Sequence, residues 1–160
     1  MERPAIGQAE IDRMFAEYSG GLCLYARQWL DGNAEDAVQE SFVKLLCCKI
    51  RPENVRAWLY RTVRNECISR LRKKQVRDRA ADKLRADGRL WFQADCDSRL
   101  DAELVQQKLA ELDESLREVV TLRLWGQLGF EEIAEITGVA VSTLHSRYHR
   151  AIDMLRDMLL

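Results

Sequence analysis

The sequence predicts an all-α protein of two small helical domains joined by a linker, with a helix-turn-helix in the C-terminal domain. Glycine (8) and proline (2) are scarce in the 160 residues, whereas a fold of many strands needs frequent turn residues. Apolar residues make up 47% of the chain, which is enough for packed cores. The length fits one ordinary domain or two small ones.

Two segments of the N-terminal region are predicted to be helical. Residues 10–30 have apolar side chains at helical spacing and are expected to form one or two helices. Gly20-Gly21 interrupts the apolar pattern. A second helix is expected from Ala34 to about Cys48, with acidic residues in its first turns, where the helix dipole favours them. Its predicted buried stripe consists of Ala37, Val38, Phe42, Leu45 and Leu46.

A long third helix is expected over residues 55–76. Pro52 disfavours helical backbone just before it, and Asn54 can cap the helix that follows. Apolar residues recur at every fourth position and predict one buried side, with Trp58 also expected in the core. The members of this stripe are Val55, Leu59, Val63, Cys67 and Leu71.

Periodicity is lost over residues 77–101, which include a turn signal at Asp87-Gly88, and helical pattern returns from Ala102. The returning pattern comprises Leu104, Val105, Leu109, Leu112, Leu116, Val119, Val120, Leu122 and Leu124. We therefore expect one domain over residues 1–79, a linker over 80–102 and a second domain over 103–160.

Charge is distributed unevenly along a chain whose net charge is only −1. Residues 1–48 carry four Lys and Arg against eight Asp and Glu, whereas residues 49–79 carry eleven against three. A local basic block is typical of a surface that meets phosphates. The alternative is a solvated helix face that serves only solubility.

The segment 130–155 has the spacing of a helix-turn-helix. Ala134 is small enough for two helices to cross closely, and Gly138, four residues later, accepts the conformation of the turn. The second helix has an apolar stripe for the angle between the helices, made of Val141, Leu144, Tyr148, Ala151, Ile152 and Leu155.

The opposite face of this second helix is rich in hydroxyl and guanidinium groups. Arginine can bond guanine, and serine or threonine can bond either bases or the backbone. The pattern predicts DNA binding, with a purely structural helical hairpin as the alternative. The outward-facing residues are Ser142, Thr143, Ser146, Arg147 and Arg150.

The sequence predicts neither a metal site nor a cofactor. His145 and His149 are spaced i, i+4, but no further ligand is well placed beside them, and His145 lies toward the core-facing edge. The five cysteines lack CxxC spacing, and Cys47 is adjacent to Cys48. We expect reduced thiols, several of them in the core, with a redox sensor as the alternative.

No segment predicts a membrane span or a secretion signal. No apolar run approaches the roughly 18 residues that a span requires, and the N-terminus lacks an apolar stretch. We expect a cytoplasmic protein that does not act at a membrane.

Three segments, in order, resemble RNA polymerase sigma factors of the extracytoplasmic-function (ECF) type, in the sigma-70 superfamily. Residues 34–46 (AEDAVQESFVKLL) resemble their region 2.2, which docks on core polymerase. Residues 55–74 resemble regions 2.3 and 2.4, which melt and read the promoter −10 element. The segment from Leu112 to Leu159 resembles region 4, whose helix-turn-helix binds the −35 element.

The resemblance implies roles for individual residues. Asp36, Gln39 and Glu40 are implied to contact core RNA polymerase. At the −10 element, where the family captures a flipped base with the loop before the third helix, the implied residues are Lys49, Asn54, Tyr60, Arg61, Arg64 and Asn65. The resemblance also implies that the outward-facing residues of the last helix bind the −35 element. An anti-sigma factor is a further implied partner.

The chain departs from the family pattern at three positions. Ser69 stands where the family often has aspartate, Ala140 where it usually has a serine helix cap, and Ser142 where it has glycine. Loss of the cap costs about 1 kcal/mol locally. These changes bear on which promoter sequence is read.

The resulting hypothesis is a non-enzymatic initiation factor. A dimeric helix-turn-helix regulator that does not join polymerase is the alternative, but the N-terminal half lacks the strands expected of a sensor domain. An enzyme acting on nucleic acid would need clustered carboxylates or a Cys/His metal set, which the sequence does not offer.

Overall fold

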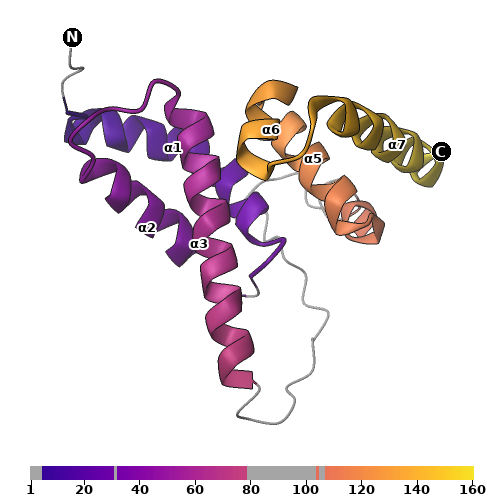
Figure 1. Ribbon diagram of the computed structural model, residues 1–160, viewed down its shortest axis with the longest axis horizontal. Helices are drawn as coiled ribbons and strands as arrows, with labels where there is room; N and C mark the ends of the chain where they lie inside the picture. Colours follow the sequence, from indigo (N-terminus) through magenta and orange to yellow (C-terminus); the bar gives the residue numbers. More distant parts are fainter. Residues whose placement is uncertain (1–4, 31, 79–103, 105–106) are drawn as a thin grey trace. The chain divides into compact units, whose positions relative to one another are not determined.

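The computed structural model describes residues 5–30, 32–78, 104 and 107–160. The chain forms two compact units, residues 1–90 and 91–160, and the described residues contain helices and no strand (Figure 1). The predicted all-α class is therefore confirmed. The expected linker over residues 80–102, with Cys96, lies outside the described residues.

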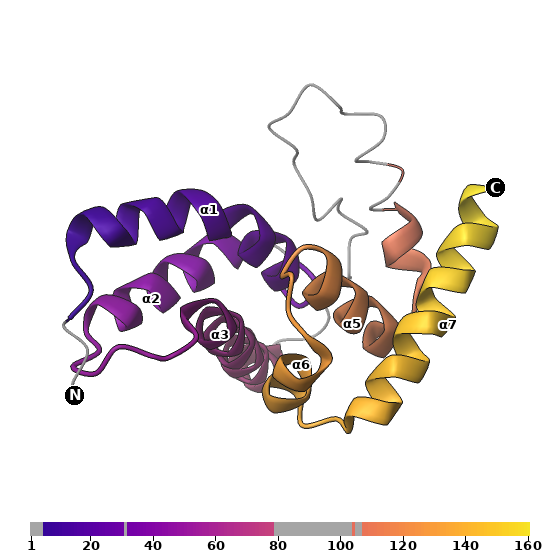
Figure 2. The same ribbon diagram turned by 90° about the horizontal axis from the view of Figure 1, so that it is seen from above.

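The first unit is a bundle of α1 (Gln8–Ala26), α2 (Ala34–Leu46) and α3 (Val55–Asp78). Each helix packs on the other two, and Figure 2 shows α1 and α2 side by side with α3 against them. Apolar side chains from all three meet in one core, formed chiefly by Leu22, Leu24, Tyr25, Ala26, Ala37, Val38, Phe42, Leu45, Leu59, Tyr60, Val63 and Cys67.

Helix α1 runs through Gly20-Gly21 without a break, so of the one or two helices expected for this segment the structure has one. Glycine in a helix interior costs roughly 0.5–1 kcal/mol relative to alanine. Buried residues on both sides of the glycines, Met14 before them and Leu22 after them, are held in place by α2 and α3. Tertiary packing therefore outweighs the local preference.

The buried stripes on α2 and α3 are largely as predicted, with exceptions at their ends. On α2, Ala37, Val38, Phe42 and Leu45 are buried, but Leu46, expected in the stripe, is 44% exposed because α2 ends there. On α3, Leu59, Val63 and Cys67 are buried, whereas Trp58 is only half-buried and not the core residue expected.

The second unit contains α5 (Glu114–Leu124), α6 (Phe130–Thr137) and α7 (Val141–Leu159), preceded by helical residues 107–111. Helix α7 packs on both α5 and α6. The core of the second unit is formed mainly by Leu109, Leu112, Leu116, Val119, Val120, Leu122, Leu128, Ile133, Ile136, Leu144 and Ala151. Leu104 and Leu124, predicted within the apolar pattern, are exposed.

Gly126 makes the close turn from α5 toward α6. A Cβ at this position would lie 2.5 Å from the Leu122 carbonyl oxygen, so a larger residue would displace the backbone of α5. The Leu128 N–H donates to the same carbonyl. The turn therefore fixes where α6 begins relative to α5.

Candidate nucleic-acid interface

Gly138 forms the turn of the helix-turn-helix, as its spacing from Ala134 predicted. It has φ 73° and ψ 12°, in the left-handed region, and its N–H donates to the Ala134 carbonyl at 2.8 Å. The Val139 N–H then donates to the Thr137 hydroxyl at 3.3 Å. These contacts end α6 and direct the chain into α7 within three residues.

The two helices of this motif begin differently. At α6, the Glu132 carboxylate accepts a hydrogen bond from the Gly129 N–H at 2.7 Å, which pairs one of the N–H groups that a helix start leaves without a partner. At α7, Ala140 occupies the N-cap and supplies no side-chain bond. The start of α7 thus has no side-chain cap, as Ala140 in the sequence indicated.

Helix α7 presents the predicted polar face. Ser142, Thr143, Ser146 and Arg150 are exposed and Arg147 is half-buried. The opposite side buries Leu144 and Ala151 against the rest of the unit. The Ser146 hydroxyl donates to the Ser142 carbonyl at 3.2 Å, so its oxygen can still accept a hydrogen bond from a donor outside the helix.

An aromatic stack supports the start of α7, and no pattern in the sequence indicated it. The His145 ring lies 4.0 Å from the Phe130 ring, centroid to centroid, and the Arg123 guanidinium carbon lies 4.9 Å from the same Phe130 centroid. His145 is exposed overall rather than facing the core. The stack brings together residues of α5, α6 and α7 beside the polar face.

The loop before α3 and the first turns of α3 hold the other set of candidate DNA-binding residues. Asn54 caps α3, since its Oδ1 accepts a hydrogen bond from the Ala57 N–H at 3.1 Å, as predicted. Lys49, Arg61 and Asn65 are exposed, and Arg64 is half-buried. Five of the six candidates therefore present at least part of their side chains at the surface.

Tyr60 is the exception, and the structure places it in the core. It is 2% exposed and packs 5.5 Å from the Tyr25 ring. Burial raises the pKa of its hydroxyl above the ordinary value. A side chain in this position supports the helix from inside and offers no surface to a DNA strand, so the prediction of Tyr60 as a contact is corrected.

The acidic candidates on α2 form a separate surface. Asp36, Gln39 and Glu40 are all exposed in the first two turns of the helix, while Ala37 and Val38 between them are buried. Glu35, in the same first turn, pairs with Arg27 of the segment after α1, and this ion pair lowers the pKa of the Glu35 carboxyl.

An ion-paired carboxylate joins α2 to α3. Glu66 of α3 lies 2.9 Å from the Lys44 ammonium of α2 and 3.1 Å from Arg70 one turn away. Lys44 and then Arg70 lower the pKa of the Glu66 carboxyl. Because Lys44 and Glu66 are 22 residues apart, nothing in the sequence indicated their contact. The i, i+4 spacing of Glu66 and Arg70, in contrast, is typical of an ion pair within one helix.

The cysteines and histidines do not form a metal site in the described part of the chain. No group of three or more His, Cys, Asp or Glu side chains gathers among those residues. Of the four described cysteines only Cys67 is buried, fewer than expected, and burial raises the pKa of its thiol to about 12. Among the described helices, none has the length and apolarity needed to cross a membrane.

Comparison with known proteins identifies both units. The family model described as Sigma-70 region 2 matches residues 14–77, and the model described as Sigma-70, region 4 matches residues 102–155. The two models thus cover the bundle with α1–α3 and the unit with the helix-turn-helix, in the order in which the resemblance placed them. A regulator unrelated to polymerase has no need of region 2, so the dimeric-regulator alternative is not favoured.

Relatives of known identity match most of the chain. The RNA polymerase sigma factor SigV of Bacillus subtilis is 32% identical over 133 residues, covering 79% of this chain and 76% of SigV. The ECF sigma factor SigW of the same organism is 32% identical over 143 residues, covering 79% and 75%. The ECF sigma factor SigE of Mycolicibacterium smegmatis is 34% identical over 140 residues, covering 81% and 54%.

Two solved structures have a similar fold. The sigma factor RpoE of Bartonella quintana, in complex with the anti-sigma factor NepR, superposes with a TM-score of 0.77 at 24% identity, covering 96% of this chain and 98% of RpoE. CnrH, in complex with the cytosolic domain of CnrY, gives 0.61 at 25% identity, covering 96% and 89%. Its two family regions and its matches to SigV and to the ECF sigma factor SigW across most of their lengths show that the protein belongs to the sigma-70 family, as a sigma factor of the ECF type.

Proposed function

We propose that this protein joins core RNA polymerase and directs it to promoters by contacting the −10 and −35 elements with different units. The observation that supports this proposal best is that regions 2 and 4 occur in one chain, each with an exposed polar face on a packed helical scaffold. Such a role needs binding surfaces and no catalytic group. A factor with these partners works in the cytoplasm, beside the polymerase.

The acidic face of α2 is the proposed polymerase contact. Asp36, Gln39 and Glu40 project from a helix whose opposite side is fixed in the core. Because the core holds the helix beneath them, these three side chains start from fixed backbone positions. Ordering them against a basic partner surface therefore costs little free energy.

The loop before α3 and the first turns of α3 are the proposed −10 contact. Lys49, Arg61 and Arg64 supply positive charge, and Asn54 and Asn65 supply amides. The Asn54 oxygen is engaged in capping α3, so its NH₂ group is the part that can donate to a base or a phosphate. Single-stranded bases are read in this way, by edge hydrogen bonds next to cationic side chains.

The polar face of α7 is the proposed −35 contact. Serine and threonine near the start of a recognition helix reach phosphates or base edges, and arginine can bind guanine through two hydrogen bonds. In this proposal Ser142 and Thr143 lie in the first turn of α7, Ser146 and Arg147 one turn further on, and Arg150 in the turn after that. The Phe130–His145 stack joins the start of α6 to the first turns of α7, which supports a fixed orientation of this face in the proposed complex.

An anti-sigma factor is the proposed regulatory partner. RpoE and CnrH, two of the similar structures, were both solved with a second protein bound. In this chain, Val43 and Leu46 on α2 are apolar and exposed, close in sequence to the acidic residues proposed to meet polymerase. A protein that covered them would compete with polymerase for α2.

The experiment that tests the proposal is reconstitution of the full chain with core polymerase, followed by transcript start-site sequencing on a promoter library. We expect initiation downstream of a shared −35 and −10 pair. Gln39→Ala with Glu40→Ala is expected to weaken polymerase association at least tenfold. The control, Gln8→Ala with Glu17→Ala, changes a Gln and a Glu that are also exposed, on α1, and is expected to leave it unchanged. Absence of co-purification with polymerase would overturn the proposal.

A further inference from the structure

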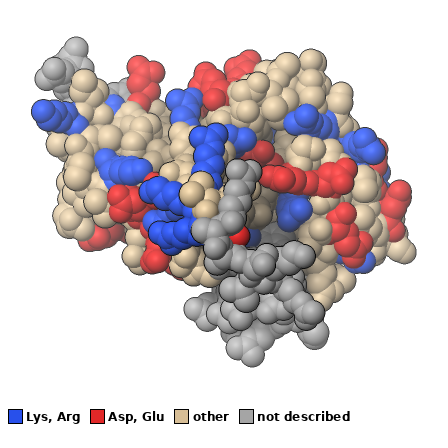
Figure 3. Space-filling view, turned by 60° about the horizontal axis from the view of Figure 1, so that its bottom comes forward, with Lys and Arg blue, Asp and Glu red and all other residues tan. Residues whose placement is uncertain are grey.

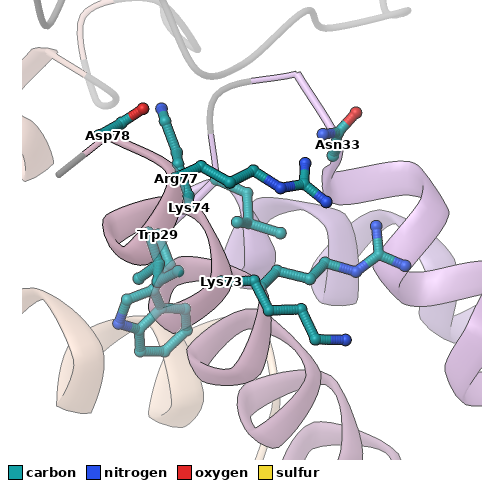
Figure 4. Close-up of a pocket in the computed structure, with 9 residues that line it drawn as sticks. Trp29, Asn33, Lys73, Lys74, Arg77 and Asp78 are labelled. Atoms are coloured by element: carbon teal, nitrogen blue, oxygen red, sulfur yellow. The ribbon is translucent and has the colours of Figure 1, made fainter. Parts of the chain in front are cut away.

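The first unit has a hollow that the proposed function does not use. It lies where the end of α3 extends past the connection between α1 and α2, and its volume is about 440 Å³. Apolar surface comes from the Trp29 indole, Leu30 and Leu71, and a polar amide comes from Asn33. Figure 4 shows Arg77 extended from α3 toward the side of the hollow where Asn33 lies. This size suits a small ligand or one unit of a polymer.

The helical wall of this hollow is strongly basic. Arg70, Lys73, Lys74 and Arg77 line it at positions i, i+3, i+4 and i+7 of α3, with Asp78 as the acidic residue. Figure 3 shows Lys and Arg side chains gathered on a face of the first unit near the end of α3. Like charges at these spacings repel one another, so the cluster is unfavourable for the helix on its own.

Most of this charge is not balanced within the described part of the chain. Arg70 is paired with Glu66, but no described carboxylate forms an ion pair with Lys73, Lys74 or Arg77. Cations near the end of a helix gain from the helix dipole. That benefit is confined to the last turn, where Arg77 is the basic residue of α3, so the dipole does not explain Lys73 and Lys74.

The buried side of α3 continues into this basic wall. Val63 and Cys67 are buried against the bundle, and the Cys67 thiol lies 4.0 Å from the Ala26 carbonyl oxygen at the end of α1. One turn further, the same side carries Leu71 and then Lys74. The helix side that is apolar where α1 covers it thus becomes cationic where it faces the hollow.

We propose that this hollow is an anion site for the phosphate groups of a nucleotide, with Lys73, Lys74 and Arg77 as the phosphate ligands. The Trp29 and Leu71 side chains supply apolar surface for the sugar or base, and Asn33 supplies hydrogen bonds. The volume of about 440 Å³, the apolar wall and the three cations fit a free nucleoside triphosphate. Binding of a DNA strand instead is an outcome that the test must separate, because residues 55–74 already resemble the regions that read the −10 element. The site is separate from the residues proposed for the −10 element.

The test uses the full chain without polymerase, so it is independent of the proposed initiation role. Binding of ATP and of inorganic pyrophosphate is measured by calorimetry, and binding of a single-stranded DNA oligonucleotide by fluorescence anisotropy. The site variant is Lys73→Ala with Arg77→Ala. The control is Arg13→Ala with Arg72→Ala, which removes the same charge from exposed positions outside the hollow. Helix content and thermal unfolding confirm that both variants are folded.

We expect the site variant to bind ATP and pyrophosphate at least tenfold more weakly than the control variant does. Loss with the oligonucleotide alone would overturn the proposal, because the cluster would then belong to the DNA-binding surface already expected of region 2. Equal affinity of the two variants for every ligand, or an equal loss in both, would overturn the proposal, because the cluster would then contribute only general charge.

Discussion

Helices α3 and α7 carry the two proposed DNA-binding faces, but different contacts hold them in place. Helix α3 begins at a side-chain cap from Asn54 and buries Leu59, Tyr60, Val63 and Cys67 in a three-helix core. Helix α7 has no side-chain cap and buries only Leu144 and Ala151 fully. Its direction depends on the turn at Gly138 and on the Phe130–His145 stack.

The difference shows which part of each site is rigid. A helix with one side in a bundle core keeps its polar residues at fixed positions even when a surface contact is lost. A helix held by a tight turn and few buried residues depends more on each of them. Substitutions matched between α3 and α7 therefore test the comparison.

The largest effect is expected from shortening one core leucine in each unit. Leu59→Ala and Leu144→Ala each remove a side chain that is nearly fully buried, and such changes cost about 2–5 kcal/mol of the free energy of unfolding. We expect Leu144→Ala to abolish binding to −35 duplex DNA while Leu59→Ala leaves it intact, as measured by anisotropy and thermal unfolding. If each variant impaired both units equally, the units would not be independent.

Arg147→Ala is expected to weaken binding to the specific −35 sequence by about 1–3 kcal/mol, if this arginine bonds a base. The measurement compares the cognate duplex with a scrambled one. Arg156→Ala, an exposed arginine in the last turns of the same helix, is the control and is expected to change both affinities little. An equal loss of affinity on the two duplexes would assign Arg147 to a phosphate.

Gly138→Ala is expected to destabilise the second unit by about 1–2 kcal/mol, because a Cβ is unfavourable in the left-handed conformation that this residue adopts. Gly20→Ala is the matched change on the first unit. Gly20 lies in the middle of α1, and a Cβ added to it would have no neighbouring atom within 4 Å, so this substitution is expected to stabilise by roughly 0.5–1 kcal/mol. Thermal unfolding measures both, and the opposite signs are the critical result.

Exchanging the caps tests the comparison between the two helices directly. Asn54→Ala removes the hydrogen bond to the Ala57 N–H and is expected to cost about 1 kcal/mol. Ala140→Ser places a hydroxyl at the uncapped start of α7, where the backbone is extended, and is expected to gain about as much. Chemical denaturation reports both, and no gain from Ala140→Ser would mean that the geometry at this N-cap does not allow capping.

The smallest effect is expected at the link between α2 and α3. Glu66→Gln removes the ion pairs with Lys44 and Arg70 and is expected to cost below about 1 kcal/mol at pH 7. Because the folded protein lowers the pKa of this carboxyl, its contribution is fully present above the unfolded pKa and is lost as the pH falls through the folded one. The stability difference between wild type and variant should therefore shrink below about pH 4; a difference that stays constant down to about pH 2 would contradict this account.

The sequence predicted the helix-turn-helix most accurately, because its geometry is local. Gly138 four residues after Ala134, and a polar face opposite Leu144, leave few alternative conformations for such a short segment. The cap at Asn54 was predictable for the same reason, since it depends on a bond between residues three positions apart and on a preceding proline.

The errors occurred where distant residues decide. The sequence left open whether Gly20-Gly21 divides its segment into two helices, and packing of α1 on α2 and α3 keeps the segment as one. Tyr60 was assigned to the DNA-binding surface by resemblance, but the Tyr25 ring beside it and the surrounding core bury it. A helical pattern places residues on one face of a helix, and it does not show which parts of that face another helix covers.

The sequence by itself determined the all-α class, the helix-turn-helix and the surface of Ser142, Thr143, Ser146, Arg147 and Arg150, because helical periodicity and turn chemistry act over a few residues. Only the tertiary structure decided that Tyr60 is core, that Lys44 pairs with Glu66 and that His145 stacks on Phe130. It alone revealed the basic hollow at the end of α3. These features join residues far apart in the chain, and their positions depend on how the helices cross.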